Sequence, residues 1–181
     1  EAQICLRRVG VNPTRIGVIK VLRAMGARIR VGDPEQRVGE PVADITVESS
    51  ELHGIEIGGD IIPNLIDEIP LLALAATQAV GETVIRDAAE LRVKESDRIQ
   101  KTVQELNLIG ADIEERSDGM VVRGPVSLTG GQCNSHGDHR LAMTLGVAGL
   151  LAQTDTFVQD AGCVDVSYAG FWKDMVGLRV A

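Results

Sequence analysis

Residues 98–114 read RIQKTVQELNLIGADIE, and this stretch decides the fold. From Ile99 to Leu106 its apolar residues recur at helical spacing, which predicts an amphipathic helix. Gly110-Ala111 follows, and glycine suits the left-handed conformation that ends a helix. A strand is expected next. The polar residues Lys101, Gln104 and Glu105 predict that the outer side of this helix is half solvated.

The same order of elements recurs along the chain. Residues 16–31 read IGVIKVLRAMGARIRV, again a helix, a Gly-Ala pair and a strand. Residues 168–180 are expected to form a third, truncated copy with its turn at Gly177. Such internal similarity is typical of folds built from repeated units.

A second element repeats between these copies. Residues 67–88 read DEIPLLALAATQAVGETVIRDA and residues 138–161 read DHRLAMTLGVAGLLAQTDTFVQDA. Each predicts a helix rich in Ala and Leu, then a turn and a strand. Because both helices carry small apolar residues on most faces, we expect them to be buried.

The strands complete the repeated unit. We expect strand pairs at 43–49 with 54–57 and at 112–116 with 120–123, and the turn at 117–119 predicts a hairpin. The unit is then buried helix, strand, outer helix and two strands. Alternating helices and strands indicate an α/β (α+β) domain, and this unit predicts a single pseudo-threefold domain over residues 1–181.

Composition excludes several classes of protein. The formal net charge is −8 and only 2% of residues are aromatic, which disfavours nucleic-acid binding. The longest apolar run, 141–152, is shorter than the roughly 20 residues of a membrane span. The first residues lack the basic start and apolar run of a signal peptide. The chain opens without Met on a strand-like pattern, so we expect a piece of a longer protein.

Three cysteines, Cys5, Cys133 and Cys163, lie far apart without C-x-x-C spacing. Neither a zinc site nor a disulfide framework is indicated, and a cytoplasmic location is expected. Phosphate-binding glycine motifs and the G-x-S-x-G elbow are absent from the sequence. The pair Asn12-Pro13 predicts a helix start.

The stretch 91–99, LRVKESDRI, concentrates charge at a predicted helix start. Ser96 is the expected N-cap. Lys94 and Arg98 are spaced to face one way, with Glu95 between them. A carboxylate between two cations near a helix N-terminus suits acid–base chemistry on an anion. A solvated, self-paired helix start is the alternative.

The stretch 135–143, SHGDHRLAM, forms a second charged helix start. Asp138 is the expected cap, and Arg140 in the first turn opposes the helix dipole unless it holds an anion. An ordinary surface arginine is the alternative. His136 and His139 have a spacing compatible with a metal, but with no further ligand pattern nearby we expect no metal site.

Asp67 opens the helix of the equivalent repeat, where an acid usually has a capping role. Its position nevertheless makes the helix starts at Asp67, Arg98 and Arg140 candidates for one shared edge. Three helix N-termini at that edge would form a strong anion site.

Four separate segments then carry a resemblance. In chain order, VGVNPTRIG, IDEIPLLALAAT, LRVKESDRI and GDHRLAM resemble segments of the EPSP synthase (3-phosphoshikimate 1-carboxyvinyltransferase) family, and the tail VQDAGCVDVSYAGFW is similar to its last strand and helix. The resemblance implies transfer of an enolpyruvyl group from phosphoenolpyruvate to shikimate 3-phosphate, without a metal or other cofactor. It implies addition followed by elimination through a tetrahedral intermediate.

The resemblance also implies site roles. Asp67 corresponds to the acid that contacts the shikimate hydroxyls and helps to deprotonate the attacking one. Glu95 corresponds to the proton donor and acceptor at the phosphoenolpyruvate methylene. Lys94 corresponds to the lysine near the shikimate 5-hydroxyl, and Arg98 and Arg140 to the pair that clamps phosphoenolpyruvate.

Two positions depart from the pattern. Val166 stands where some members carry a lysine, and Glu90 where some carry asparagine. The family's N-terminal motifs, a Lys-Ser pair and a glycine-rich threonine segment, are missing from the sequence. The resemblance therefore implies the C-terminal domain of a two-domain enzyme, an inside-out α/β barrel of βαβαββ units that is inactive alone.

Two other functions stay open. The first is the sister enzyme that transfers enolpyruvyl to UDP-N-acetylglucosamine, although the pairing of KESDR with DHRLAM favours the shikimate branch. The second is a non-catalytic α/β binding module that kept the fold.

Overall fold

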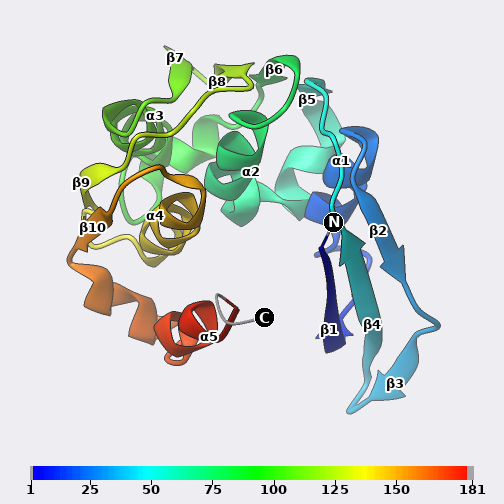
Figure 1. The fold of residues 1–181 in the computed structure, drawn as a ribbon. Coiled ribbons are helices and arrows are strands. Elements are labelled where there is room, and N and C mark those ends of the chain that lie inside the picture. Colours follow the sequence, from blue (N-terminus) through cyan, green and yellow to red (C-terminus); the bar gives the residue numbers. More distant parts are fainter. Residues whose placement is uncertain (1, 179–181) are drawn as a thin grey trace.

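The computed structural model describes residues 2–178, and within them three sheets surround a group of helices (Figure 1). The strands are β1 (Gln3–Gly10), β2 (Arg28–Val31), β3 (Glu35–Arg37), β4 (Glu40–Glu48), β5 (Glu56–Ile57), β6 (Gly81–Ile85), β7 (Asp112–Arg116), β8 (Gly119–Gly124), β9 (Gly131–Asn134) and β10 (Thr156–Gln159). The α-helices are α1 (Gly17–Ala24), α2 (Ile69–Ala76), α3 (Arg98–Leu108), α4 (His139–Leu151) and α5 (Phe171–Leu178). Short 3-10 helices are η1 (Gly59–Asn64), η2 (Ile66–Glu68), η3 (Ala89–Val93) and η4 (Ala161–Val166).

The sheets lie around α2, α3 and α4. In Figure 1 the sheet of β1, β4, β2 and β3 is at the right, the sheet of order β5-β6-β8-β7 is at the top, and the parallel pair β9-β10 is at the left. The first sheet is antiparallel, whereas the second joins a parallel pair, β5-β6, to antiparallel neighbours. This arrangement of helices and sheets agrees with the predicted α/β (α+β) class and its threefold plan.

The repeat that the sequence predicted is confirmed for its two complete copies. Each of α1 and α3 ends at a glycine with positive φ, 107° at Gly26 and 100° at Gly110, and each is followed by a strand. Those strands, β2 and β7, pair in antiparallel fashion with β4 and β8. The predicted hairpin at 117–119 is present as the connection from β7 to β8.

The predicted pairing of 43–49 with 54–57 is wrong. Both edges of β4 are already occupied, one by β1 and the other by β2. The short strand β5 (Glu56–Ile57) instead lies parallel to β6 in the second sheet. Gly54 contributes to this placement, because a Cβ there would overlap the backbone of Glu82.

The core is aliphatic and lies between α2, α3 and α4, which pack against one another. Leu72 and Leu74 of α2 and Leu141 and Leu145 of α4 are fully enclosed, so both Ala/Leu-rich helices are buried as predicted. On the side of α3 predicted to be half solvated, Gln104 is exposed and Lys101 half-buried as expected, but Glu105 is only 2% exposed. Its partners are described below.

Two predicted helix starts are wrong. Asn12 accepts a hydrogen bond from the backbone N–H of Thr14 in a turn, and α1 begins later, at Gly17, without a side-chain cap. At α3 the cap is Asp97, whose Oδ1 accepts from the N–H of Gln100, and Ser96 is not the cap. Ser96 instead donates to Asp138.

The C-terminal copy also differs from expectation. Gly177 lies inside α5 and makes no turn, and the predicted elements beyond residue 178 fall outside the described residues. α5 packs on α4 through Phe171 and Trp172, which contact the position of Gly146. None of the helices described has the combined length and apolar character needed to cross a bilayer.

Candidate active site

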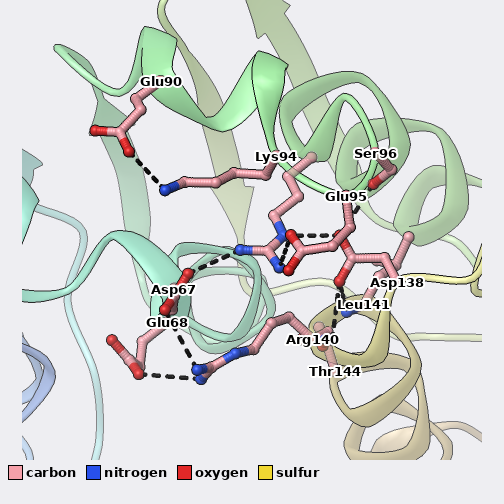
Figure 2. A network of polar contacts seen from close by, with 11 residues as sticks. Asp67, Glu68, Glu90, Lys94, Glu95, Ser96, Asp138, Arg140, Leu141 and Thr144 are labelled. Atoms are coloured by element: carbon pink, nitrogen blue, oxygen red, sulfur yellow. Dashed lines mark hydrogen bonds and ion pairs between the residues drawn. The ribbon is translucent and has the colours of Figure 1, made fainter. Parts of the chain in front are cut away.

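The chain segments at the starts of α2, α3 and α4, including the residues just before each helix, meet at one site, and Figure 2 shows the charged side chains that they bring there. Asp138 caps α4 as predicted, accepting from the N–H groups of Arg140 and Leu141. Asp67 lies in η2, immediately before α2, and makes no cap bond. Its predicted capping role is therefore wrong, and its carboxylate is available for the site.

Arg98 is the centre of the network. Its Nη1 lies 2.8 Å from Asp67, its Nη2 lies 2.5 Å from Glu95 and its Nε lies 2.7 Å from Asp138. The Arg98 side chain is only 1% exposed. Burial by itself lowers the pKa of Arg98, but the hydrogen bond and charge of Asp138 outweigh that effect and raise it. The guanidinium therefore stays charged inside the protein.

Asp67 connects the two arginines that the sequence singled out. Its Oδ1 accepts from Arg98, and its Oδ2 lies 3.3 Å from Nη2 of Arg140. Glu68 lies 3.4 Å from Nη1 of Arg140, and desolvation raises the pKa of Glu68. Asp67 is 40% exposed, so a ligand can reach the edge where the two guanidinium groups meet.

Glu95 and Lys94 leave the same turn in different directions. The Glu95 carboxylate covers Nη2 of Arg98 and is 48% exposed. Lys94 extends to Glu90, with its Nζ 2.5 Å from that carboxylate (Figure 2). The hydrogen bond from Lys94 to Glu90 raises the pKa of Lys94 and keeps it protonated.

Asp138 is a member of the site that the sequence identified only as a cap. Its Oδ2 accepts from both Arg98 and Ser96, and its side chain is 0% exposed. Desolvation raises the pKa of Asp138, but the hydrogen bond from Arg98 overcomes this and lowers it. The one sequence signal for a role of Asp138 in the site was its position two residues before Arg140. The burial of Asp138 against Arg98 arises only in the folded structure.

The exposed side of the network adjoins a cavity of about 340 Å³. Arg15, Asn64, Asp67, Glu68 and Arg140 are among its lining residues. A larger hollow of about 590 Å³ lies between α4, β10 and α5, with mostly apolar side chains. The smaller cavity is the better candidate for an anion, because Arg15 and Arg140 border it and Arg140 lies in the first turn of α4.

The structure thus brings together Asp67, Glu95, Arg98 and Arg140, whereas the amine of Lys94 pairs with Glu90 and not with one of these four side chains. His136 contacts Glu105 on the far part of α3 and lies outside this network. Among the residues described, no three His, Cys, Asp or Glu side chains gather as a metal-binding group. Val166 is exposed in η4.

Comparisons with known proteins identify relatives of this chain. The sequence profile of "EPSP synthase (3-phosphoshikimate 1-carboxyvinyltransferase)" matches residues 1–175. A 3-phosphoshikimate 1-carboxyvinyltransferase of Desulforudis audaxviator is 58% identical over 99% of this chain and 42% of its own length. One from Bacillus cereus is 53% identical over 97% of this chain and 41% of its own length.

Solved structures show the same fold. EPSP synthase from Acinetobacter baumannii superposes with a TM-score of 0.92 at 40% identity, covering 97% of this chain and 41% of that chain. The enolpyruvyl transferase NikO from Streptomyces tendae has a TM-score of 0.76 at 20% identity, covering 98% of this chain and 39% of that chain, and supports the fold alone. The predicted enolpyruvyl transferase fold is confirmed.

The chain spans about two fifths of the length of the relatives it matches. The match nevertheless runs through nearly all of its residues, including the three helix starts that form the charged network. The chain belongs to the EPSP synthase family.

Proposed function

We propose that this chain carries part of the active site of a 3-phosphoshikimate 1-carboxyvinyltransferase. The reaction transfers the enolpyruvyl group of phosphoenolpyruvate to the 5-hydroxyl of shikimate 3-phosphate and releases phosphate. One observation carries the proposal: Asp67 bridges Arg98 and Arg140 beside a cavity that Asp67 and Arg140 line. Both substrates are anions, and guanidinium groups suit the forked hydrogen bonds that carboxylate and phosphate oxygens accept.

Arg98 and Arg140 would bind phosphoenolpyruvate through forked hydrogen bonds. In the structure Asp67 and Glu95 occupy Nη1 and Nη2 of Arg98, where they stand in for the carboxylate or phosphate oxygens of a substrate. Because both acids are partly exposed, they can rotate away when an anion takes their place. Asp138 remains on Nε and holds the guanidinium in position.

Asp67 and Glu95 would manage the protons. In the addition step, Asp67 helps to remove the proton of the 5-hydroxyl, whose oxygen bonds to C2 of phosphoenolpyruvate. Glu95 gives a proton to the methylene carbon, which becomes a methyl group in the tetrahedral intermediate. In the elimination step, Glu95 takes a methyl proton back as phosphate leaves, and the double bond is restored.

Lys94 would lie near the 5-hydroxyl and assist proton transfer. Its contact with Glu90 supports a protonated amine in the free protein. A cation here stabilises the negative charge that develops on the attacking oxygen. No step of the proposed mechanism requires a metal or an organic cofactor.

We further propose that residues 1–181 form one domain, the C-terminal half, of a two-domain enzyme. The candidate site supports this, because Asp67 and Glu95 are 40% and 48% exposed and no other described element covers them. A second, N-terminal domain would complete the site by closing over it, and this chain alone would be inactive.

The three free cysteines fit a reducing cytoplasm.

Membership of the EPSP synthase family favours shikimate 3-phosphate over UDP-N-acetylglucosamine as the acceptor. A non-catalytic binding module could keep the fold without a carboxylate, Asp67, that contacts both Arg98 and Arg140. The 3.3 Å contact of Arg140 with Asp67, beside the buried Arg98, favours the enzyme.

A chimera tests the proposal. This chain would replace the matching part of the Desulforudis audaxviator relative, and phosphate release from phosphoenolpyruvate would be measured with and without shikimate 3-phosphate. We expect release that depends on the acceptor and falls at least a hundredfold with Glu95→Gln, because general acid–base catalysis contributes roughly 10²–10⁴-fold. Glu115→Gln, on β7, is the matched control and should retain activity. A folded chimera that binds neither substrate would refute the proposal.

A further inference from the structure

A buried contact outside the candidate active site joins α3 to the segment before α4. Oε1 of Glu105 lies 2.7 Å from Nε2 of His136, which donates to it. Oε2 of the same carboxylate accepts from the backbone N–H of Asn134 at 2.9 Å. The Glu105 side chain is 2% exposed and that of His136 24% exposed, so the carboxylate takes its partners from within the protein. None of the roles proposed above uses this pair.

The segment that Glu105 holds, residues 134–138, has an uncommon backbone. His136 has a φ of 54° and Gly137 a φ of 74°, both in the left-handed region. Such a conformation is costly for a residue with a side chain and persists where its surroundings determine it. Here the side chain of Asn134 also accepts from the N–H of His136 at 2.7 Å. The contact with Glu105 therefore helps to fix the path of the chain into α4.

That path leads directly to the active-site residues. Asp138 donates its backbone N–H to the carbonyl of Ser135 at 2.9 Å, so its position depends on the same segment. Its carboxylate caps α4 through the N–H of Arg140 and binds Nε of Arg98. A shift of residues 134–138 would move both arginines relative to each other.

One face of α3 thus holds both ends of this segment. Arg98 and Glu105 are two helical turns apart, with the buried Thr102 between them, and both side chains are enclosed. Glu105 binds residues 134 and 136, and Arg98 binds Asp138. Together, these contacts fix the segment before α4, and with it the start of α4, against α3.

We propose that His136 and Glu105 are positioning residues for the anion site. They touch no substrate. Their hydrogen bond fixes the segment that sets Asp138, and Asp138 sets the Nε–H direction of Arg98 and the first turn of α4 with Arg140. The identity of the anion, phosphoenolpyruvate, rests on the proposed function, whereas the effect on Arg98 does not.

The experiment compares three variants of the 181-residue chain. His136→Ala removes the contact, and His136→Gln restores a donor to Glu105 without the imidazole ring. Asn107→Ala is the matched control: Asn107 lies on the same helix, and its side chain makes two hydrogen bonds, 2.8 and 3.0 Å long, with the backbone of Ile113 in β7. It secures α3 to a different neighbour, so it measures the general effect of loosening this helix.

Two readouts are taken on each variant. The first is the ¹H–¹⁵N NMR signal of the Arg98 Nε–H group, which reports the bond to Asp138 without any ligand. The second is phosphoenolpyruvate binding, followed by titration of the backbone signals of residues 138–141. Methyl signals from the core confirm that each variant is folded.

We expect His136→Ala to shift the Arg98 signal, to speed its solvent exchange and to weaken phosphoenolpyruvate binding about tenfold, the scale of one hydrogen bond to a charged group. His136→Gln should restore most of the wild-type Arg98 signal and of the phosphoenolpyruvate affinity, and Asn107→Ala should change neither the signal nor the affinity. Equal effects of His136→Ala and Asn107→Ala, or an unchanged Arg98 signal in His136→Ala, would overturn the positioning role. If His136→Ala shifts the Arg98 signal, but the wild-type chain and the chimera bind no phosphoenolpyruvate, the result supports the positioning role and counts against the proposed function.

Discussion

Asp138 and Arg98 form an ion pair that the fold encloses. The Nε atom of Arg98 lies 2.7 Å from Oδ2 of Asp138, and their side chains are 1% and 0% exposed. Removing one partner of such a pair leaves an uncompensated buried charge. We therefore expect Asp138→Asn to lower the free energy of unfolding by about 3–5 kcal/mol, measured by urea denaturation.

Asp97→Asn is the control for that measurement. Asp97 is also a helix cap beside an arginine, but its ion pair with Arg92 is about one-third exposed. Asparagine caps a helix well, so a loss below about 1 kcal/mol is expected. Equal losses in the two variants would contradict the special position of Asp138.

The same ion pair predicts how stability depends on pH. The pKa of Asp138 is below its ordinary value of 3.8 in the folded protein, although burial alone would raise it, because Arg98 donates to the carboxylate. A lowered pKa stabilises the folded state above the unfolded-state pKa, and the contribution disappears as the pH falls through the folded pKa. We expect the difference in unfolding free energy between wild type and Asp138→Asn to be constant near neutral pH. Below about pH 4 it should shrink. A difference that grows on acidification would contradict this sign.

Arg140 predicts a variant that separates binding from stability. Its side chain is 32% exposed, and its contacts with Asp67 and Glu68 are long. Arg140→Ala should weaken phosphoenolpyruvate binding roughly 10- to 100-fold while lowering stability by less than about 1 kcal/mol. Calorimetric titration and urea denaturation measure the two effects. Arg86→Ala removes another arginine held by two carboxylates, Glu56 and Asp87, and should leave binding unchanged.

Glu90 predicts a measurable change in Lys94. The hydrogen bond from Lys94 to Glu90 is the largest cause of the raised pKa of that lysine. Glu90→Gln should therefore lower the pKa of Lys94, as followed by NMR titration of its Nζ signal. Glu115→Gln, whose carboxylate faces Arg92, should have no effect. An unchanged Lys94 titration in Glu90→Gln would show that the contact does not persist in solution.

Gly119 and Gly10 predict opposite responses to alanine. A Cβ at Gly119 in β8 would overlap the carbonyl group of Ile85 in β6, so Gly119→Ala should cost about 2–3 kcal/mol in thermal unfolding. A Cβ at Gly10 meets no atom within 4 Å, so Gly10→Ala should leave stability equal or raise it by up to about 1 kcal/mol. A reversed order would contradict the pairing of β6 with β8.

Much of the fold follows from local patterns. The apolar spacing from Ile99 to Leu106 predicted α3, and the glycines after α1 and α3 marked their ends, because these features act over one or two helical turns. The helix starts were harder to predict. Ser96 and Asp97 are adjacent and both cap well, and Asp138, distant in sequence, decides between them by binding Ser96.

Contacts between distant residues limited the rest. Glu105 occupies a position where a charged residue normally faces water, and its burial is explained by the hydrogen bonds that it accepts from His136 and from the backbone N–H of Asn134. Similarly, the family resemblance identified Asp67, Glu95, Arg98 and Arg140 as site residues. It did not predict that the carboxylates of Asp67 and Glu95 cover the guanidinium of Arg98. Such contacts depend on how α2, α3 and α4 pack.

Because every nitrogen of Arg98 is bonded inside the protein, this side chain loses its rotational freedom when the chain folds. A ligand that replaces Asp67 and Glu95 therefore finds one recognition group whose conformational entropy, up to about 2 kcal/mol for an arginine, is already lost. Arg140, with nearly a third of its surface in water, still has that freedom to lose. Ordering of Arg140 should then account for more of the unfavourable binding entropy than ordering of Arg98.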